Sequence, residues 1–403
     1  MYWKRTLIRG ARKGTGALAI AAGRRRLRRP LLPTGVTDVR VVRDGPTGSD
    51  RETRLAAQIT EELARRLALP SLSMAATRAN GIVWQTTCGY ADLARRAPAG
   101  PDTAYLAGSI SKAITATLLG RLVDDGRIAL DDTVGLHLHR DAGHVAPATV
   151  RHLAGHTAGV RHFSEHSLTS MWHEQVSLRS WRGARDAARL YTTEPLAFSP
   201  GQDFLYSTPG YTILGAVMEE ATQRSYPDLL ARELAGPLGL TGVEPDDGRR
   251  RRRDRAVTYV RVQNRYVDPP RPHPSHKWPG GGLTATPTDL VQLTSALMGG
   301  TFLREETVKA MWTPQETGNG RTHPMGYGMG WATGSAGDRL GLADAVPTVH
   351  HGCTVEGGAA FLLLLPNQGI AVSAMTNLHL GPEQSSELRD AVYTLAGGLA
   401  RRS

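Results

Sequence analysis

Cysteine is nearly absent from this chain, which has two in 403 residues. Cys88 and Cys353 cannot form the disulfide framework that holds many small secreted domains together, so the fold must depend on a hydrophobic core. Long apolar runs are absent as well: those present, such as residues 361–365, are far shorter than the roughly 18 residues that a membrane-spanning helix needs. With 40% hydrophobic residues, the sequence predicts a soluble globular body.

Acidic residues are absent from residues 1–37, which contain ten Lys and Arg. This segment carries almost all of the formal net charge of +11, so the rest of the chain is close to neutral. Zinc-finger spacing is absent, as is any basic stretch with interleaved aromatic residues, so we do not expect nucleic-acid binding. A second basic run at 249–253, with Asp254 and Arg255, predicts an exposed loop after the turn at 246–248.

The first 50 residues are predicted to be a disordered basic arm that precedes one catalytic domain at 51–403. Their apolar stretch at 17–22 is followed by arginines instead of a small-residue cleavage site, so we do not expect a secretory signal. Two alternatives stay open. The arm resembles an Arg-rich organellar transit peptide, although it contains no serine up to residue 37, and it could equally contact an anionic membrane surface. The compartment is therefore not assigned.

Lysine is also scarce, since only five of the 48 basic residues are lysines and the others are arginines. Arginine keeps its proton under ordinary conditions, whereas a lysine amine can be neutral and act as a base. One of the five, Lys112, follows Ser109 by three residues. At the start of a helix this spacing places both side chains on one face, so the amine can reach the serine oxygen. Because a base must be neutral, this chemistry requires burial or nearby positive charge, and an exposed Lys112 would be an ordinary helix residue.

Histidine, by contrast, is plentiful, and fourteen residues raise the question of a metal site. No His-Glu-x-x-His motif or cysteine pair accompanies them. We therefore expect no metal and no other cofactor, and we interpret the histidines between residues 137 and 156 as structural or exposed. They are His137, His139, His144, His152 and His156.

Apolar periodicity divides the chain into three parts. A helix and a hairpin open the domain, and three strands with an amphipathic helix close it. The predicted helices are 53–67, 109–125, 211–221 and 387–399, and the predicted strands are 71–76, 82–90, 350–355, 359–365 and 370–375. The middle, about 127–345, is predicted to be a large helical insertion. Because terminal strands can complete a single sheet, we predict an α/β domain whose antiparallel sheet is built from N- and C-terminal strands and flanked by helices.

Further motifs follow Ser109 and Lys112 in a fixed order, with Tyr206-Ser207-Thr208 among them. They are residues 153–160, 194–201, 204–215, 280–284 and 327–331. From about residue 53 to the C-terminus, the chain resembles the serine β-lactamase-like and penicillin-binding-protein-like hydrolases related to class C β-lactamases. The likeness is strongest to the mitochondrial serine β-lactamase-like branch, whose motif is also Tyr-Ser-Thr. The resemblance implies the β-lactamase/transpeptidase-like fold.

The resemblance also implies a role for each matching residue. Ser109 would be the nucleophile that forms an acyl-enzyme, Lys112 its base or the group that lowers the pKa of Tyr206, and Tyr206 the proton relay to the leaving group. His351 would orient substrate and complete the proton network, while the backbone amides of Ser109 and Thr354 would form the oxyanion hole. The alternatives are that Tyr206 only packs and that His351 only bonds within the sheet.

Two residues depart from the family pattern. Cys353 follows His351 and Gly352 where the family has glycine, and a side chain there would narrow the site or tilt the strand. Thr208 stands where many relatives have asparagine, and its hydroxyl offers fewer hydrogen bonds than an amide to the side chain of a β-lactam. The strand arrangement of the family also implies that Cys88 and Cys353 are too far apart to form a disulfide.

The sequence thus predicts a metal-independent serine hydrolase that acts on an amide or ester, with a small molecule or a peptide as substrate. We expect a peptidase or esterase in preference to an efficient β-lactamase. The alternative is a catalytically weak or inert scaffold or sensor on the same fold, since the mitochondrial relatives also assemble into filaments. A homo-oligomer is compatible with both functions.

Overall fold

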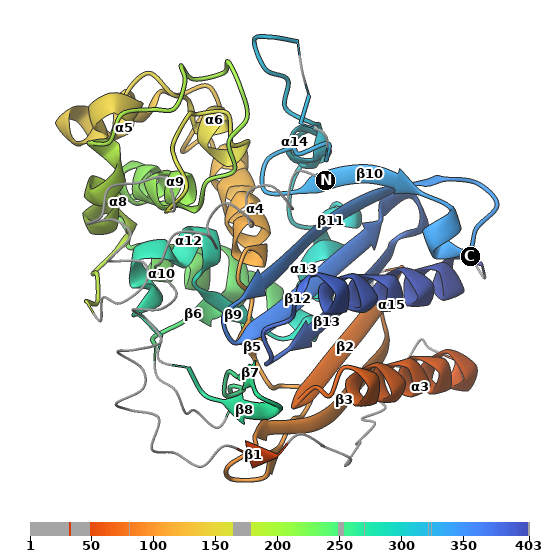
Figure 1. The fold of residues 1–403 in the computed structure, drawn as a ribbon. Coiled ribbons are helices and arrows are strands. Elements are labelled where there is room, and N and C mark those ends of the chain that lie inside the picture. Colours follow the sequence, from red (N-terminus) through yellow and green to blue (C-terminus); the bar gives the residue numbers. More distant parts are fainter. Residues whose placement is uncertain are drawn as a thin grey trace.

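The computed structural model describes residues 32–33, 49–79, 81–163, 179–248, 254–269, 271–320, 322–323 and 325–401. Most of the predicted N-terminal arm and the whole basic run at 249–253 lie outside these residues. Within them, a seven-stranded antiparallel sheet carries helices on both faces and stands beside a mainly helical part (Figure 1). The predicted fold class is confirmed.

The central sheet joins the two ends of the domain. Its strand order is β10-β11-β12-β13-β2-β3-β4, so the N-terminal hairpin pairs with the C-terminal strands where β13 meets β2. The strands are β2 (Ser71–Arg78), β3 (Gly81–Asp92), β4 (Ala97–Pro98), β10 (Ala332–Ala336), β11 (Val346–Val355), β12 (Gly358–Leu365) and β13 (Ile370–Thr376). Both predicted hairpins are present. The edge strand β10 was not predicted and lies inside the range expected to be helical.

Both faces of the sheet are buried, which explains the uninterrupted apolar run of β12. Phe361, Leu363 and Leu365 enter one hydrophobic core, whereas Leu362 and Leu364 enter the other, because side chains alternate along a strand. Each buried leucine contributes about 1.5–3 kcal/mol through loss of apolar surface from water. The helices α3 (Asp50–Arg66) and α15 (Pro382–Ala400) cover the first core, and α4 (Ile110–Asp124) and α13 (Pro287–Met298) cover the second.

The helix α4 stands between the sheet and the helical part, as Figure 1 shows. Its buried residues surround the helix, as predicted from the all-round apolar pattern. The neighbouring helices are α5 (Val134–Leu138), α6 (Val150–Ala154), α8 (Ala184–Thr192), α9 (Thr208–Thr222), α10 (Tyr226–Leu229), α11 (Gly236–Leu238), α12 (Trp278–Gly281) and α14 (Glu305–Trp312). The N-terminal end of α4 therefore lies where the mainly helical part of the domain meets the central sheet.

Two small three-stranded sheets complete the described structure. The first has the order β5-β9-β6, and the second has the order β1-β8-β7. Their strands are β5 (Tyr105–Leu106), β6 (Glu244–Pro245), β9 (Leu283–Ala285), β1 (Leu32–Pro33), β7 (Val260–Val262) and β8 (Arg265–Val267). The first of these sheets matters for the site, because β5 leads into α4 and β9 follows α12.

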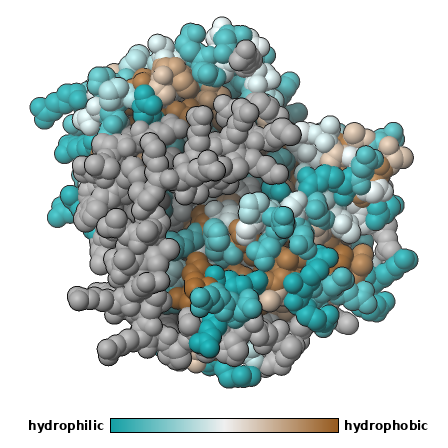
Figure 2. Space-filling view, in the orientation of Figure 1, coloured by the Kyte–Doolittle hydropathy of each residue, from teal (hydrophilic) through white to brown (hydrophobic). Residues whose placement is uncertain are grey.

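The surface and the two thiols agree with the expectations for a globular body. On the face shown in Figure 2, hydrophilic side chains are interspersed with smaller apolar patches. Within the described ranges, no helix combines the length and the apolar character that crossing a bilayer requires. Cys88 on β3 and Cys353 on β11 are separated by β12, β13 and β2, and both are free thiols, as predicted.

Arg255 contradicts the prediction of an exposed basic loop. Its side chain is only 4% exposed and pairs with Asp246 and Glu244, at 2.7 Å in each case. The physical reason is backbone pairing: the residues on either side of Arg255 hydrogen-bond to Ala104 and hold the arginine against these carboxylates. A run of charges in sequence does not distinguish a solvated side chain from a buried, paired one.

Candidate active site

Ser109 lies at the N-terminal end of α4, where a tight turn presents its side chain. Gly108 before it has φ +49°, and a Cβ atom there would lie 2.7 Å from Cys353 Sγ, so only glycine fits. Ser109 is the N-cap residue, but its hydroxyl makes no capping hydrogen bond to the helix. The hydroxyl is therefore available to other partners, and the side chain is only partly buried, so a substrate can reach it.

Lys112 is fully buried one turn further along α4, which meets the condition that the sequence analysis set for a base. Its Nζ lies 3.5 Å from Ser109 Oγ, 3.0 Å from Thr208 Oγ1 and 2.5 Å from the backbone oxygen of Gly280. A neutral amine has two N–H groups and one lone pair. If Thr208 and Gly280 accept the two N–H groups, the lone pair is directed at the Ser109 hydroxyl.

Tyr206 also contacts the nucleophile. The Ser109 side chain hydrogen-bonds to the Tyr206 hydroxyl, and Lys112 Nζ lies 4.6 Å from the centre of the Tyr206 ring. Burial raises the pKa of Tyr206, and the hydrogen bond to Ser109 only partly offsets this effect. The phenol is therefore protonated at neutral pH and can donate a proton.

His156 fixes the segment that carries Tyr206, in agreement with its interpretation as a structural residue. The backbone oxygen of His156 accepts from Leu205 N at 2.9 Å, and its Nδ1 accepts from Ser207 N at 3.2 Å. Its ring also packs on Tyr206, with 4.3 Å between ring centres. The motif at 153–160 thus shapes the wall of the site that holds the phenol.

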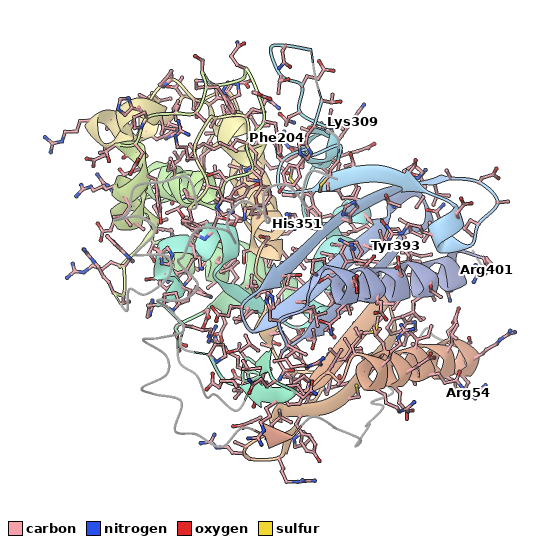
Figure 3. All side chains as sticks on the ribbon, viewed as in Figure 1. Arg54, Phe204, Lys309, His351, Tyr393 and Arg401 are labelled. Atoms are coloured by element: carbon pink, nitrogen blue, oxygen red, sulfur yellow. The ribbon has the colours of Figure 1, made fainter. Side chains whose placement is uncertain are left out.

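His351 lies on β11 near the middle of the molecule (Figure 3). It is buried, and the hydroxyl of Tyr327 contacts its ring. Its Nδ1 lies 3.1 Å from Gly352 O, and its Nε2 lies 3.1 Å from the hydroxyl of Tyr327. Because a carbonyl can only accept, Nδ1 carries the proton and Nε2 accepts from Tyr327. Burial, followed by the nearby Lys112, lowers the pKa of His351 to about 3, so the ring is neutral. His351 is thus hydrogen-bonded to Tyr327 and to its own strand.

Cys353 brings a sulfur atom to the start of α4. The thiol faces the backbone N–H groups of Ala360, Ser109 and Ile110, and burial raises its pKa to about 11. It is therefore a neutral thiol and not a thiolate at physiological pH. A Cβ atom at Gly108 would lie 2.7 Å from Cys353 Sγ, so the thiol lies beside one of the two amides expected to form the oxyanion hole, that of Ser109.

The two residues that flank Cys353 make their contacts away from Ser109. A Cβ atom at Gly352 would lie 2.8 Å from the ring of Phe361, so packing of the sheet requires glycine there. The hydroxyl of Thr354 lies 3.0 Å from Ser385 Oγ on α15. Only the backbone of Thr354 can take part in the predicted oxyanion hole.

Sequence reasoning gave no role to three groups that complete the site: the carbonyl of Gly280 and the hydroxyls of Tyr211 and Tyr327. Tyr211 lies below Lys112, 5.7 Å from Nζ to the ring centre, and its hydroxyl donates to Ala154 O at 2.7 Å. A Cβ atom at Gly280 would lie 2.8 Å from Thr208 O. The only signal in the sequence was that these residues lie in the conspicuous motifs at 204–215, 280–284 and 327–331.

The side chains that could bind a metal ion are dispersed. In the part of the chain that the structure describes, no group of three or more His, Cys, Asp and Glu side chains is arranged to hold a metal ion. Of the histidines near the nucleophile, His156 has its pKa lowered well below the usual value, mainly by burial. The neutral imidazoles of His156 and His351 pack and hydrogen-bond near Lys112.

Comparison with known proteins places this geometry in a family. The mitochondrial serine beta-lactamase-like protein LACTB of Homo sapiens is 25% identical in an alignment of 406 positions, gaps included, that spans 77% of this chain and 74% of that protein. The D-amino acid amidase of Ochrobactrum anthropi, solved with L-phenylalanine, superposes with a TM-score of 0.71 at 20% identity, over 88% of this chain and all of that one.

A second solved structure is the octameric penicillin-binding protein homologue of Pyrococcus abyssi, with a TM-score of 0.68 at 23% identity over 86% of this chain and 77% of that one. These likenesses agree with the fold described above. The Beta-lactamase family model matches residues 56–396, which include α4, the Tyr206 segment and β11. The chain therefore belongs to the beta-lactamase family of serine-hydrolase-like proteins.

Proposed function

We propose that this protein is a serine hydrolase that forms an acyl-enzyme on Ser109 with an amide or ester substrate. The observation that carries the proposal is the placement of Lys112: the amine is completely buried, yet its Nζ lies 3.5 Å from the serine oxygen. A surface lysine at the same spacing would be held in water as an ammonium ion, which cannot accept a proton.

In the proposed reaction, Lys112 takes the proton of the Ser109 hydroxyl as the oxygen attacks the carbonyl carbon of the substrate. The carbonyl oxygen becomes negative and is stabilised by backbone N–H groups at the start of α4 and on β11. The bond to the leaving group then breaks, and Tyr206 donates a proton to that group and regains one from Lys112, which becomes neutral again. A water molecule then gives a proton to Lys112 as it attacks the acyl-enzyme, and the departing Ser109 oxygen takes that proton back as the acid is released. The raised pKa of Tyr206 favours Lys112, and not a tyrosinate, as the resting base.

A peptide or ester is a better candidate substrate than a β-lactam. The hydroxyl of Thr208 already accepts a hydrogen bond from Lys112 at 3.0 Å, so it helps to orient the amine. Residue Thr208 as a whole is only 6% exposed. It is poorly placed to bind the amide side chain of a β-lactam as well. The D-amino acid amidase likeness is compatible with amide hydrolysis, but at 20% identity it supports the fold alone.

The contact of Cys353 with the Ser109 amide supports a second candidate function, a weakly active or inert scaffold. A sulfur atom in this position competes with the carbonyl oxygen of a substrate for the same donor. The octameric state of the penicillin-binding protein homologue makes self-assembly a reasonable property to test alongside activity. An inert protein that forms large particles in a concentration-dependent manner would favour the scaffold.

The two functions are separated by labelling with a fluorophosphonate probe and with a fluorescent penicillin. We expect the wild type to react with the fluorophosphonate faster than with the penicillin, and Ser109→Ala to remain unlabelled. Ser385→Ala, which removes a hydroxyl on α15, serves as a matched control and is expected to label like the wild type. Equal labelling of the wild type and Ser109→Ala would exclude Ser109 as the nucleophile.

A further inference from the structure

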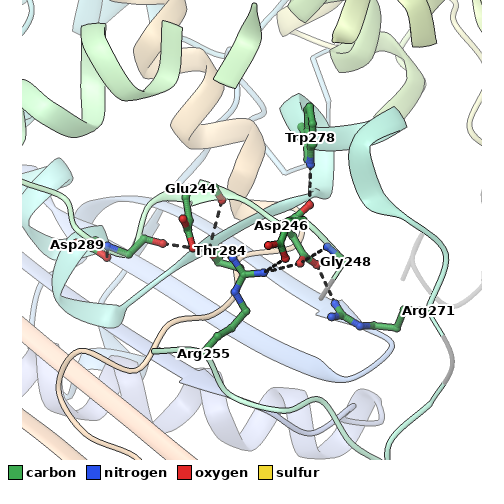
Figure 4. Close-up of polar contacts among 10 residues, drawn as sticks. Glu244, Asp246, Gly248, Arg255, Arg271, Trp278, Thr284 and Asp289 are labelled. Carbon is green, nitrogen blue, oxygen red and sulfur yellow. Dashed lines mark hydrogen bonds and ion pairs between the residues drawn. The ribbon is translucent and has the colours of Figure 1, made fainter. Parts of the chain in front are cut away.

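A cluster of charged side chains lies next to Trp278, the first residue of α12, and takes no part in the reaction proposed above (Figure 4). Asp246 is 1% exposed and binds two arginines: Arg255 at 2.7 Å through Oδ1 and Arg271 at 2.9 Å through Oδ2. Arg255 also pairs with Glu244 at 2.7 Å and with Asp247 at 3.2 Å. Arg255 and Asp246 are the buried pair of the cluster, and burying two charges is costly unless they are paired and hydrogen-bonded as they are here.

The backbone of Asp246 bridges the two ends of α12. Its N–H donates to the oxygen of Gly282, and its carbonyl accepts from Trp278 Nε1, at 2.8 Å in both cases. Trp278 is the first residue of α12, and Gly282 directly follows the last. A four-residue helix has little stability of its own, so these two bonds help to hold α12 in place, together with the bond from Thr115 Oγ1 on α4 to Pro279 O at 2.7 Å.

The position of α12 in turn determines one partner of Lys112. The backbone oxygen of Gly280, within α12, accepts from Lys112 Nζ at 2.5 Å. Gly280 is packed closely against Thr208 of α9: a Cβ atom at Gly280 would lie 2.8 Å from Thr208 Cγ2 and from Thr208 O. A shift of α12 would therefore alter the direction of the amine relative to Ser109.

The same cluster is tied to the segment that leads into the nucleophile. Asp254 O and Ala256 N, on either side of Arg255, hydrogen-bond to the N–H and carbonyl of Ala104, at 2.8 and 2.9 Å. Three residues later, Ala107 N donates to Leu283 O at 2.9 Å, on the strand that follows α12. Arg255 thus connects the chain before Ser109 with the chain on both sides of α12.

We propose that Asp246, together with Arg255 and Arg271, is a positioning unit that orients the Lys112 amine through Trp278 and the Gly280 carbonyl. The inference rests on the proposed function, because the orientation of Lys112 matters for rate only if Ser109 is acylated. The hydrogen bonds of the three side chains do not involve Ser109. Their effect is on the direction of the lone pair of Lys112, and therefore on the acylation step and not on substrate binding.

The scarcity of lysine allows a test that does not depend on activity. Protein labelled with 13C at lysine Cε has five side-chain signals in the full chain, and loss of one signal in Lys112→Arg assigns Lys112. We expect the Lys112 signal to shift in Asp246→Asn and in Trp278→Phe, which removes the N–H that α12 donates to Asp246 and replaces the indole with a smaller ring. Glu52→Gln is the matched control, since it removes the charge of another buried carboxylate, 2.9 Å from Arg78, on α3.

The second readout is the rate of acylation by the fluorophosphonate, measured over a range of probe concentrations with each variant below its unfolding temperature. We expect Asp246→Asn and Trp278→Phe to lower the maximal acylation rate at least fivefold with an unchanged half-saturating concentration. Glu52→Gln is expected to lower the melting temperature but to keep the wild-type rate. A loss of stability alone cannot produce this pattern.

An unmoved Lys112 signal in both variants, or a moved signal with a wild-type acylation rate, would overturn the inference. Failure of the proposed function has a different signature, because the wild type and Ser109→Ala would then label equally. In that case the Lys112 signal alone would decide whether the cluster orients the amine.

Discussion

Replacing Cys353 with alanine or glycine is expected to accelerate acylation of Ser109. The sulfur faces the N–H groups of Ser109 and Ile110, and it lies so close to Gly108 that a Cβ atom there would be 2.7 Å away. Alanine removes the sulfur and keeps the Cβ atom. Glycine restores the residue that the family pattern has at this position.

The expected gain follows from the value of one oxyanion donor. Loss of such a donor costs about 2.7–4 kcal/mol, or roughly 10²–10³ in rate. A neutral thiol is a weak hydrogen-bond acceptor, so a substrate oxygen can displace it from the Ser109 N–H for only part of this free energy. Burial raises the pKa of Cys353 to about 11, so no thiolate competes for the donor near neutral pH. We therefore expect the variants to react about tenfold faster, which corresponds to about 1.4 kcal/mol.

Stability should change in the opposite direction. Both variants leave space beside α4, and glycine within a strand costs roughly a further 0.5–1 kcal/mol. The assay is the second-order rate constant for reaction with the fluorophosphonate, with the melting temperature measured on the same samples. Cys353→Ser, which keeps an atom in the γ position, is expected to remain slow. Cys88→Ala, on β3, tests for a general effect of removing a thiol.

Wild-type rates in both Cys353→Ala and Cys353→Gly would refute this reasoning. The sulfur would then not obstruct the Ser109 amide, and the departure from the family pattern would have no consequence for the oxyanion hole. A tenfold gain in Cys88→Ala as well would equally contradict it, because that thiol is separated from the site by three strands of the sheet.

Further predictions concern the base, the phenol, acid stability and a buried cap. Lys112→Arg should lower the acylation rate at least ~10²-fold, since arginine does not give up its proton. Tyr206→Phe removes the proton donor, so it should slow the reaction of esters with poor leaving groups more than that of esters with good ones. His351 has its pKa lowered to about 3 by burial, so unfolding takes up a proton between about pH 6.5 and 3. Its contribution to the free energy of unfolding is complete above pH 6.5 and is lost as the pH falls, by about 2 kcal/mol at pH 5. His351→Gln should therefore flatten the pH dependence of the free energy of unfolding, measured by urea titration at several pH values. An unchanged pH dependence would contradict the assignment. Glu219 is 8% exposed and accepts from three backbone N–H groups, those of Ala184, Arg185 and Tyr226. Glu219→Ala leaves all three without this acceptor and should cost about 3 kcal/mol or more in urea denaturation, whereas a loss below 1 kcal/mol would show that other groups or water replace it.

The parts of the fold that were predictable have local causes. The hairpin of β2 and β3 follows from two runs of strand-forming residues on either side of Asn80 and Gly81 in the sequence, and α4 follows from its apolar spacing between Ser109 and Gly126. The contact between Lys112 and Ser109 was predictable for the same reason, because three residues along a helix fix which side chains are neighbours.

The remaining parts depend on contacts between distant segments. The Gly280 carbonyl, 168 residues from Lys112 in sequence, is a backbone group and has no side-chain signature. The burial of Arg255 depends on pairing with Ala104, and a charge run gives no hint of it. The contact of Cys353 with Ser109 arises only when β11 packs against the start of α4. The family resemblance could assign roles to positions, but it could not show what this chain's own cysteine does there.

The central claim is that Lys112 activates Ser109, and the most direct test is to find where an acylating ester becomes attached. The wild type is incubated with an activated ester, quenched in acid and mapped by peptide mass spectrometry, beside Lys112→Ala. The account predicts an acyl group on Ser109 in the wild type and at least ~10²-fold slower acylation in Lys112→Ala. Acylation of another residue, or equal rates for the two proteins at Ser109, would contradict it.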